Sequence, residues 1–226
     1  MPWAACRGSE VQMCGRFALH HPAHEIHETF NIERPIFLVE PRYNIAPTQT
    51  LAVVTPARDL VGMRWGLVPK WSKDGRPYIN ARAETIAQKP AFAAALRARR
   101  IVVPCSGFYE WRTEGKLKVA LHIRLRGGEL FGIAAVWEPA EALPTVALIT
   151  VAANDAVRQV HDRMPAILRR GEWAGWIDPT NSAPEALLRP LPKDDLELFT
   201  VSNRVNRVSE DDASLVQPER RGLFGG

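Results

Sequence analysis

The most constraining feature of this 226-residue chain is a strict alternation of side chains between residues 117 and 126. Leucine, valine and isoleucine occupy the odd positions, whereas lysine, alanine, histidine and arginine occupy the even ones. A period of two places successive side chains on opposite faces of a β-strand, so this pattern predicts a half-buried antiparallel strand. On this interpretation His122 lies on the wetter face of the strand.

Strand signals continue on both sides of this segment. The pairs Glu114-Gly115 and Gly127-Gly128 are turn signals, so the alternating strand is expected to belong to a three-strand meander. The more uniformly apolar run at 145–153 favours a central strand. The strands of the meander are expected at 101–103, 108–111 and 117–125. Further strands are predicted at 50–55, 60–65, 130–137, 145–153 and 196–201.

Helix signals are fewer and shorter. The strongest is PAFAAALRARR at 90–100, which begins with proline, is rich in alanine and ends in basic residues, as the helix dipole prefers. Strands outnumber helices and occur in consecutive runs, which predicts a single α+β domain on a strongly curved antiparallel sheet. Helices are expected at 22–30, 90–100, 171–177 and 183–189.

The composition is that of an ordinary globular domain, with 46% hydrophobic and 24% charged residues. No run approaches the roughly 20 apolar residues that span a bilayer. The first twelve residues also lack the apolar centre of a secretory signal. We therefore expect a cytoplasmic protein without membrane association. The net charge of +4 permits a polyanionic partner but does not require one.

Cysteine and histidine spacings give no sign of a metal site. The three cysteines form neither a disulfide framework nor a C-x-x-C pair, and Cys6 and Cys105 are interpreted as ordinary thiols. His20 and His24 are four residues apart, but no carboxylate or cysteine completes a ligand set at the usual separations. No metal and no cofactor are expected.

Cys14, in the run Met13-Cys14-Gly15-Arg16-Phe17, is the residue with the most distinctive chemical potential. If the chain started at Met13, removal of that methionine would leave Cys14 with a free α-amine beside its thiol. These groups have pKa values of about 7.7–8.0 and about 8.5, so both are partly nucleophilic near neutral pH. Together they can convert an aldehyde into a five-membered thiazolidine. A lone cysteine is otherwise more often a buried small hydrophobe, but Arg16 beside it favours the reactive thiolate.

Four polar residues stand where a functional role is plausible. Glu110 lies in an aromatic-rich strand, where a carboxylate is costly unless it is functional or paired, for instance with Arg112. His161 follows the predicted central strand and suits proton transfer, or alternatively caps a loop carbonyl. Asn80 and Arg82 alternate along an extended segment, so both side chains point the same way, where Arg82 could hold a phosphate.

An aromatic and basic loop follows the second predicted strand. Trp65 and Trp71 flank its first part, and Lys70, Lys73 and Arg76 are interleaved with them. Single-stranded nucleic-acid grooves combine aromatic and basic residues in this way. A packed loop fringed with lysine would have the same composition, so both interpretations stay open.

Several of these segments recur together in one known family. MCGRF, RYNIAPTQ, RWGLVPKW, INARAET, CSGFYEWR, HDRMP and VSNRVN occur in this order. In this order they resemble the SOS-response-associated peptidase (SRAP) family of abasic-site-processing proteins. The resemblance runs from Met13 to about Pro218. It implies a single α+β domain around a curved, barrel-like, mostly antiparallel sheet with peripheral helices and a basic groove.

The resemblance also implies a function. In that family the N-terminal cysteine forms a thiazolidine with the ring-opened sugar of an abasic site in single-stranded DNA, which shields the lesion from strand cleavage. On this basis the protein is expected in the DNA damage response, on the nucleoid when bound to damaged DNA. The implied catalytic residues are Cys14, Asn80, Glu110 and His161. The implied DNA-binding residues are Gly15, Arg16, Trp65, Trp71, Arg82 and Thr150.

Two departures from the family pattern affect this expectation. Residues 1–12 form a leader that would block the amine of Cys14, unless translation starts at Met13 or the leader is cleaved. We favour a misassigned start over a propeptide. Ser72 stands where some members carry a second aromatic that wedges between bases, so stacking rests more on Trp71. Residues 219–226 are expected to be a loose tail.

Two alternative functions remain open from the sequence. Cys14 and His161 could serve a cysteine peptidase or self-processing hydrolase, with Glu110 or Asn80 as the orienting group. A non-catalytic nucleic-acid-binding module is the other. No obligate protein partner is indicated, and we expect a monomer.

Overall fold

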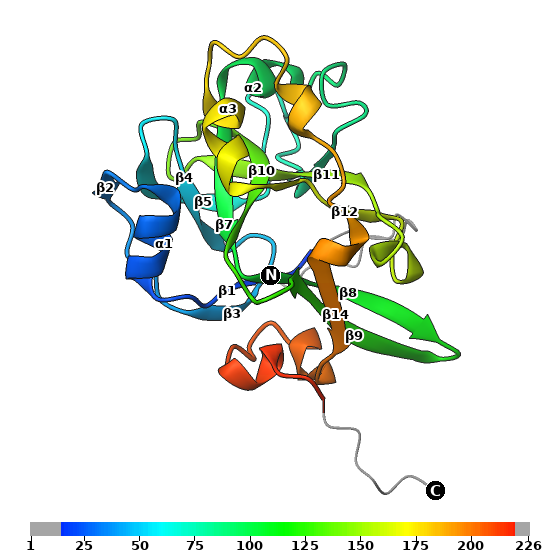
Figure 1. Ribbon diagram of the computed structural model, residues 1–226. Coiled ribbons are helices and arrows are strands. Elements are labelled where there is room, and N and C mark those ends of the chain that lie inside the picture. Colours follow the sequence, from blue (N-terminus) through cyan, green and yellow to red (C-terminus); the bar gives the residue numbers. More distant parts are fainter. Residues whose placement is uncertain (1–14, 220–226) are drawn as a thin grey trace, which may run out of the picture.

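The computed structural model describes residues 15–219, and five strands at its centre close into a barrel (Figure 1). Their order around the barrel is β11-β10-β7-β4-β5, and β5 pairs again with β11. Every pairing is antiparallel except that of β5 with β11, so the barrel is mixed. The five strands are β4 (Thr50–Val54), β5 (Asp59–Trp65), β7 (Arg100–Cys105), β10 (Phe131–Glu138) and β11 (Thr145–Ala152).

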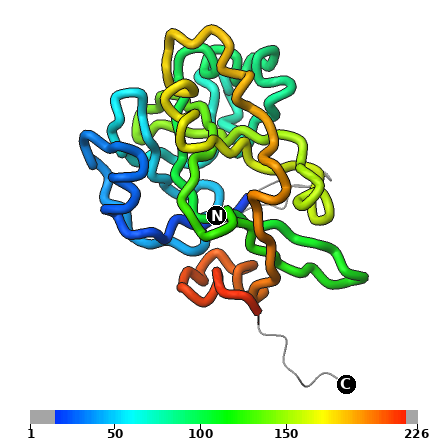
Figure 2. Tube along the Cα trace, viewed as in Figure 1, coloured from blue at the N-terminus to red at the C-terminus, as the bar shows by residue number. Residues whose placement is uncertain are grey.

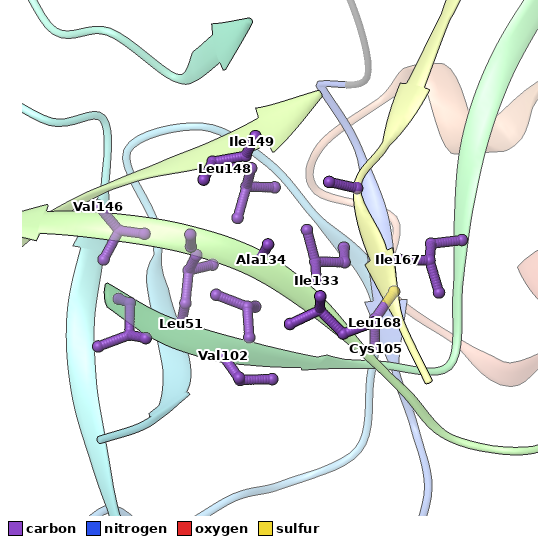
Figure 3. Close-up of a cluster of buried hydrophobic side chains, with 14 of the residues drawn as sticks. Leu51, Val102, Cys105, Ile133, Ala134, Val146, Leu148, Ile149, Ile167 and Leu168 are labelled. Atoms are coloured by element: carbon purple, nitrogen blue, oxygen red, sulfur yellow. The ribbon is translucent and has the colours of Figure 1, made fainter. Parts of the chain in front are cut away.

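The barrel holds the main hydrophobic core, part of which is drawn in Figure 3. Nearly all residues of β7, β10 and β11 are buried, on both faces of the sheet. Their inner side chains fill the barrel, and short helices cover part of the outside. These strands are therefore uniformly apolar rather than alternating. The central position expected for 145–153 is confirmed. Labelled core residues include Leu51, Val102, Cys105, Ile133, Val146 and Leu168.

Four short strands extend the barrel sheet. On β11, β6 (Asn80–Arg82) pairs in parallel and β12 (Arg163–Pro165) pairs antiparallel. In this register Thr150 lies opposite both Arg82 and Pro165, so β11 joins the NAR and HDRMP segments. β13 (Ile167–Leu168) pairs with β10, and β2 (Arg34–Pro35) pairs with β5.

A second, five-stranded antiparallel sheet packs beside the barrel, and its β8–β9 hairpin projects from the molecule (Figure 1). The order is β14-β9-β8-β1-β3. The strands are β1 (Phe17–Leu19), β3 (Arg42–Ile45), β8 (Gly107–Glu114), β9 (Leu117–Leu125) and β14 (Leu196–Thr200).

The expected three-strand meander is therefore wrong at its first strand. β7 pairs with β10 and β4 in the barrel, whereas β8 pairs with β9 and β1 in the second sheet. Only Ser106 separates β7 from β8. One residue is too short for a hairpin, so the chain continues from one sheet into the other. The β8–β9 hairpin itself is confirmed, with Gly115 at a positive φ of 60° in its turn.

The expected wetter face of β9 is also wrong, because His122 is 0% exposed. A second hydrophobic cluster covers this face, contributed by β1, β8, β9 and the C-terminal segment. The C-terminal trace turns back beneath the second sheet to reach it (Figure 2). The members of this cluster are Ala18, Tyr109, Ala120, Val201, Val205, Leu215 and Val216.

Helices are short and lie at the periphery. The helix expected at 22–30 is confirmed as α1 (Ala23–Phe30), and that at 90–100 is confined to α2 (Ala93–Ala98). α3 (Trp173–Ile177) matches 171–177, whereas 183–189 forms a 3₁₀ turn at Pro184–Leu187. No α-helix in residues 15–219 is both long and apolar enough to traverse a lipid bilayer. The single-domain α+β expectation around a barrel-like sheet is confirmed.

Candidate functional site

The first described residues run along β8 at the junction of the two sheets. Phe17 pairs with Phe108, and the carbonyl of Arg16 accepts a 3.0 Å hydrogen bond from the backbone N–H of Tyr109. Extending the antiparallel register of Phe17 and Phe108 by two residues, beyond the end of β1, places Gly15 opposite Glu110. Cys14 itself lies outside the described residues.

A second segment approaches the same point. A Cβ built on Gly15 would lie 3.9 Å from Cδ1 of Ile79 and 4.0 Å from Cγ of Pro47. Ile79 directly precedes Asn80. Gly15 therefore lies between β8, the start of the NAR strand and the Pro47 loop.

Glu110 is buried in β8, with 3% of its surface exposed. Its neighbour across the hairpin is Leu121, and Tyr109 and Trp111 flank it along the strand. Arg112, its suggested ion-pair partner, forms an ion pair with Glu114 at 2.5 Å. A buried carboxylate in an aromatic-rich strand is costly to keep unless it is paired or functional.

Asn80 and Arg82 both lie on β6, where Asn80 is half-buried and Arg82 is exposed. Arg82 is thus available to a ligand. Its neighbour in the register, Thr150, is fully buried. The Thr150 hydroxyl lies 3.4 Å from the Ala81 carbonyl, to which it donates, and 3.3 Å from Nη2 of Arg163. Thr150 therefore fixes the strands behind the site rather than offering a surface.

His161 lies in the loop between β11 and β12, and 10% of its side chain is exposed. Its Nδ1 accepts a 3.0 Å hydrogen bond from the backbone N–H of Arg163 and lies 3.0 Å from Oδ1 of Asp162. When the ring is neutral, the bond from Arg163 places the proton on Nε2. When the ring is protonated, Nδ1 can donate to Asp162 and Nε2 keeps its proton. Nε2 is a donor in both states.

Arg163 is a residue whose role the sequence did not reveal. It forms two hydrogen bonds with Glu84, at 2.6 and 2.8 Å, and donates to the Thr150 carbonyl at 2.7 Å. The hydrogen bond from Arg163 lowers the pKa of the Glu84 carboxyl. This ion pair ties the HDRMP loop to the segment after β6. Both residues lie in quoted motifs, but nothing in the sequence indicates that they meet.

Arg16 is half-buried and has no carboxylate partner in the part of the chain that the structure describes. Its Nη1 donates to Oδ1 of Asn44 at 2.7 Å and to the Val205 carbonyl at 2.6 Å. Its guanidinium carbon lies 5.9 Å from the ring centre of Trp111. Burial lowers the pKa of Arg16, although a guanidinium stays charged at neutral pH. A positive charge held in this way suits an external anion.

The two tryptophans of the aromatic and basic loop have different environments. Trp65 is 0% exposed, its Nε1 donates to the Ile79 carbonyl at 2.9 Å, and its ring packs on Phe17. In this structure the ring of Trp65 has no accessible face to stack on a base. Trp71 is 61% exposed and retains such a face. Within residues 15–219, no group of three His, Cys, Asp or Glu residues is placed to hold a metal ion.

The fold and the site together define a class: a single-domain α+β protein with a closed mixed barrel and a composite polar site where its N-terminal strand meets a second sheet. The chain belongs to the SRAP family, because the family model described as SOS response associated peptidase (SRAP) matches residues 13–208.

Named relatives cover most of this chain. The abasic site processing protein YoaM of Bacillus subtilis is 38% identical, over 92% of this chain and 99% of its own length. YedK of Escherichia coli, also called an abasic site processing protein, is 30% identical over 91% of this chain and all of its own. A solved structure from Bacteroides thetaiotaomicron matches 91% of this chain and 99% of its own, with a TM-score of 0.83 and 23% identity. That likeness supports the fold.

Proposed function

We propose that this protein captures abasic sites in single-stranded DNA by forming a covalent thiazolidine through Cys14. The observation that carries the proposal is the buried carboxylate of Glu110, which the register of β1 on β8, extended beyond Phe17, places opposite Gly15, the residue bonded to Cys14. The similarity to relatives named abasic site processing proteins supports the substrate. The product would shield the lesion from strand cleavage.

The chemistry uses groups that an N-terminal cysteine carries. An abasic deoxyribose opens to an aldehyde at C1′. The α-amine of Cys14 attacks this carbon, and the resulting hydroxyl leaves as water to give an imine. The thiol then adds to the imine carbon, and its proton passes to nitrogen, which closes the thiazolidine. One water is lost overall, and no oxidant or reductant is needed.

Three side chains receive roles in this sequence. Glu110 assists opening of the sugar hemiacetal and shuttles protons at the amine. His161 donates to the departing ring oxygen, in agreement with the proton on its Nε2. Asn80 orients the terminal residue, since the side chain of its neighbour Ile79 points toward Gly15, 3.9 Å from where a Cβ there would lie.

The remaining residues hold the strand. Arg16 and Arg82 are assigned to flanking phosphates, and Trp71 to stacking on a base. Arg82 and Trp71 are exposed. Arg16 makes its bonds to Asn44 and Val205 through Nη1, and Nη2 is not one of the donors in those two bonds. We assign Thr150 to the pocket as a buried support for β6 and Arg163.

The proposal requires Cys14 to be the first residue of the active protein. The family match begins at Met13, which supports a start there followed by removal of that methionine. Cleavage of the Met13–Cys14 bond by the protein itself would have the same result, and the family description includes the word peptidase.

Intact-mass measurement, before and after incubation with abasic single-stranded DNA, tests the proposal. We expect a mass that begins at Cys14 and a denaturant-resistant adduct that is lost in Cys14→Ala. Cys105→Ala is the matched control, because Cys105 is buried and burial raises the pKa of its thiol. Undiminished adduct with Cys14→Ala would refute the proposal. Leader cleavage that fails in a His161 variant, without any adduct, would favour a peptidase, and binding reversed by salt would favour a non-catalytic module.

A further inference from the structure

Asn44, on β3, joins three distant parts of the chain. It is 0% exposed, and the two N–H groups of its Nδ2 are shared among the backbone carbonyls of Val205, Arg207 and Glu210, at 3.2, 3.0 and 2.7 Å. Its Oδ1 accepts the hydrogen bond from Arg16. Both ends of a buried amide are thus fully used, which fixes the orientation of the side chain.

The same carbonyl also binds Arg16. Val205 accepts from Asn44 and from Nη1 of Arg16, so the amide, the guanidinium and the C-terminal segment form a closed triangle of hydrogen bonds. Trp111 lies against the guanidinium, and its Nε1 donates to Oδ1 of Asn206 at 2.6 Å. The 3₁₀ turn Asn203–Asn206 therefore lines one side of the half-buried Arg16.

This triangle acts on the strand end that leads to the candidate site. The backbone of Arg16 is held by Tyr109 on β8, and its side chain is held by Asn44. With both fixed, the direction in which the chain leaves Arg16 towards Gly15 is fixed as well.

The C-terminal segment has a separate anchor to β3. Asp211 forms an ion pair with Arg42 and accepts from the backbone N–H of Tyr43. Removing Asn44 therefore leaves an attachment in place, and removing Asp211 leaves the triangle in place. The effect of the triangle on Arg16 can be separated from the general stability of this region.

We propose that Asn44 is a positioning residue for the covalent reaction, acting through Arg16 to place the N-terminal residue against Glu110. The inference rests on the proposed function and deepens it. A misplacement of about 1 Å at a reacting centre costs roughly a hundredfold in rate. Affinity for the DNA strand depends on several separate contacts, so we expect it to change less than the reaction rate.

The experiment compares Asn44→Ala with Asp211→Asn by the rate of adduct formation on abasic single-stranded DNA. The rate at saturating DNA and the half-saturating concentration are measured separately, with thermal melting of each variant. We expect Asn44→Ala to lose at least tenfold in saturating rate and less than threefold in affinity for an intact oligonucleotide. Asp211→Asn is expected to melt earlier but to keep its rate within twofold.

Asn44→Asp separates the two halves of the side chain. It keeps an acceptor for Arg16 but opposes three carbonyl oxygens, so we expect partial recovery of the rate despite lower stability. A wild-type rate for Asn44→Ala, or an equal loss of rate in Asp211→Asn, would overturn the inference. Absence of any adduct with the wild-type protein would refute the proposed function instead, so the two failures are distinguishable.

Discussion

His122 is a buried histidine whose replacement is expected to stabilise the protein. Its ring is 0% exposed and packs against Tyr109 and Phe199, and neither ring nitrogen has a hydrogen-bond partner within the described residues. An unsatisfied buried polar group costs about 1–3 kcal/mol. His122→Leu has a similar volume and removes this cost, so we expect its free energy of unfolding at pH 7 to rise by about that amount.

The effect must grow as the pH falls. Burial, more than the nearby His20 and Arg124, lowers the pKa of His122 from 6.5 to about 3. Below pH 6.5 the unfolded chain binds a proton that the folded chain refuses until about pH 3. The wild type therefore loses about 1.4 kcal/mol per pH unit across this window. The wild type is therefore free of this penalty only above pH 6.5, where His122 is neutral in both the folded and unfolded states. At pH 4.5 the advantage of His122→Leu should exceed that at pH 7 by roughly 3 kcal/mol.

Urea unfolding followed by tryptophan fluorescence at pH 7.0, 5.5 and 4.5 measures this difference directly. Carboxylates titrate in both proteins, so subtracting the two curves isolates His122. His24→Leu, at an exposed position of α1, is the control and should show no growing advantage. The reasoning is refuted if the difference between His122→Leu and wild type stays constant from pH 7 to 4.5.

Three further predictions concern the site and its support. Glu110→Gln should slow adduct formation by roughly 10²–10⁴-fold, the usual contribution of a general acid or base. Single-turnover kinetics on abasic DNA would measure this rate, and an unchanged rate would contradict the assigned role. Arg82→Gln should reduce the slope of log affinity against log salt by about 0.7, the value for one phosphate on a single strand, and binding titrations at several salt concentrations would show whether it does. Arg163→Met should remove the ion pair with Glu84 and loosen the HDRMP loop, so that adduct formation slows. Glu84→Gln is the milder control and should retain more activity.

The sequence predicted the fold from local signals. Strict alternation at 117–125 and apolar runs at 130–137 and 145–153 correspond to β9, β10 and β11 within one or two residues. Its errors arise where distant segments decide the environment. The wetter face of β9 is covered by the C-terminal turns, and the surface of Trp65 is taken by Phe17 and Ile79. The C-terminal turns and Phe17 lie far from β9 and Trp65 in the sequence, so no local pattern reveals that they cover them.

The candidate site shows the same division between chemistry and placement. Residue types identified Glu110, His161 and Asn80 as candidates, because a carboxylate among aromatics, a histidine after a central strand and an asparagine beside an arginine are each unusual. The register of β1 on β8, extended beyond Phe17, and the position of Ile79 beside Gly15 place Glu110 and Asn80 near that glycine. Only the folded chain provides both. Asn44 was visible only as part of a motif, since its function lies in three carbonyls more than 160 residues away. A backbone carbonyl has no sequence identity, so positioning groups of this kind can be found only from the structure.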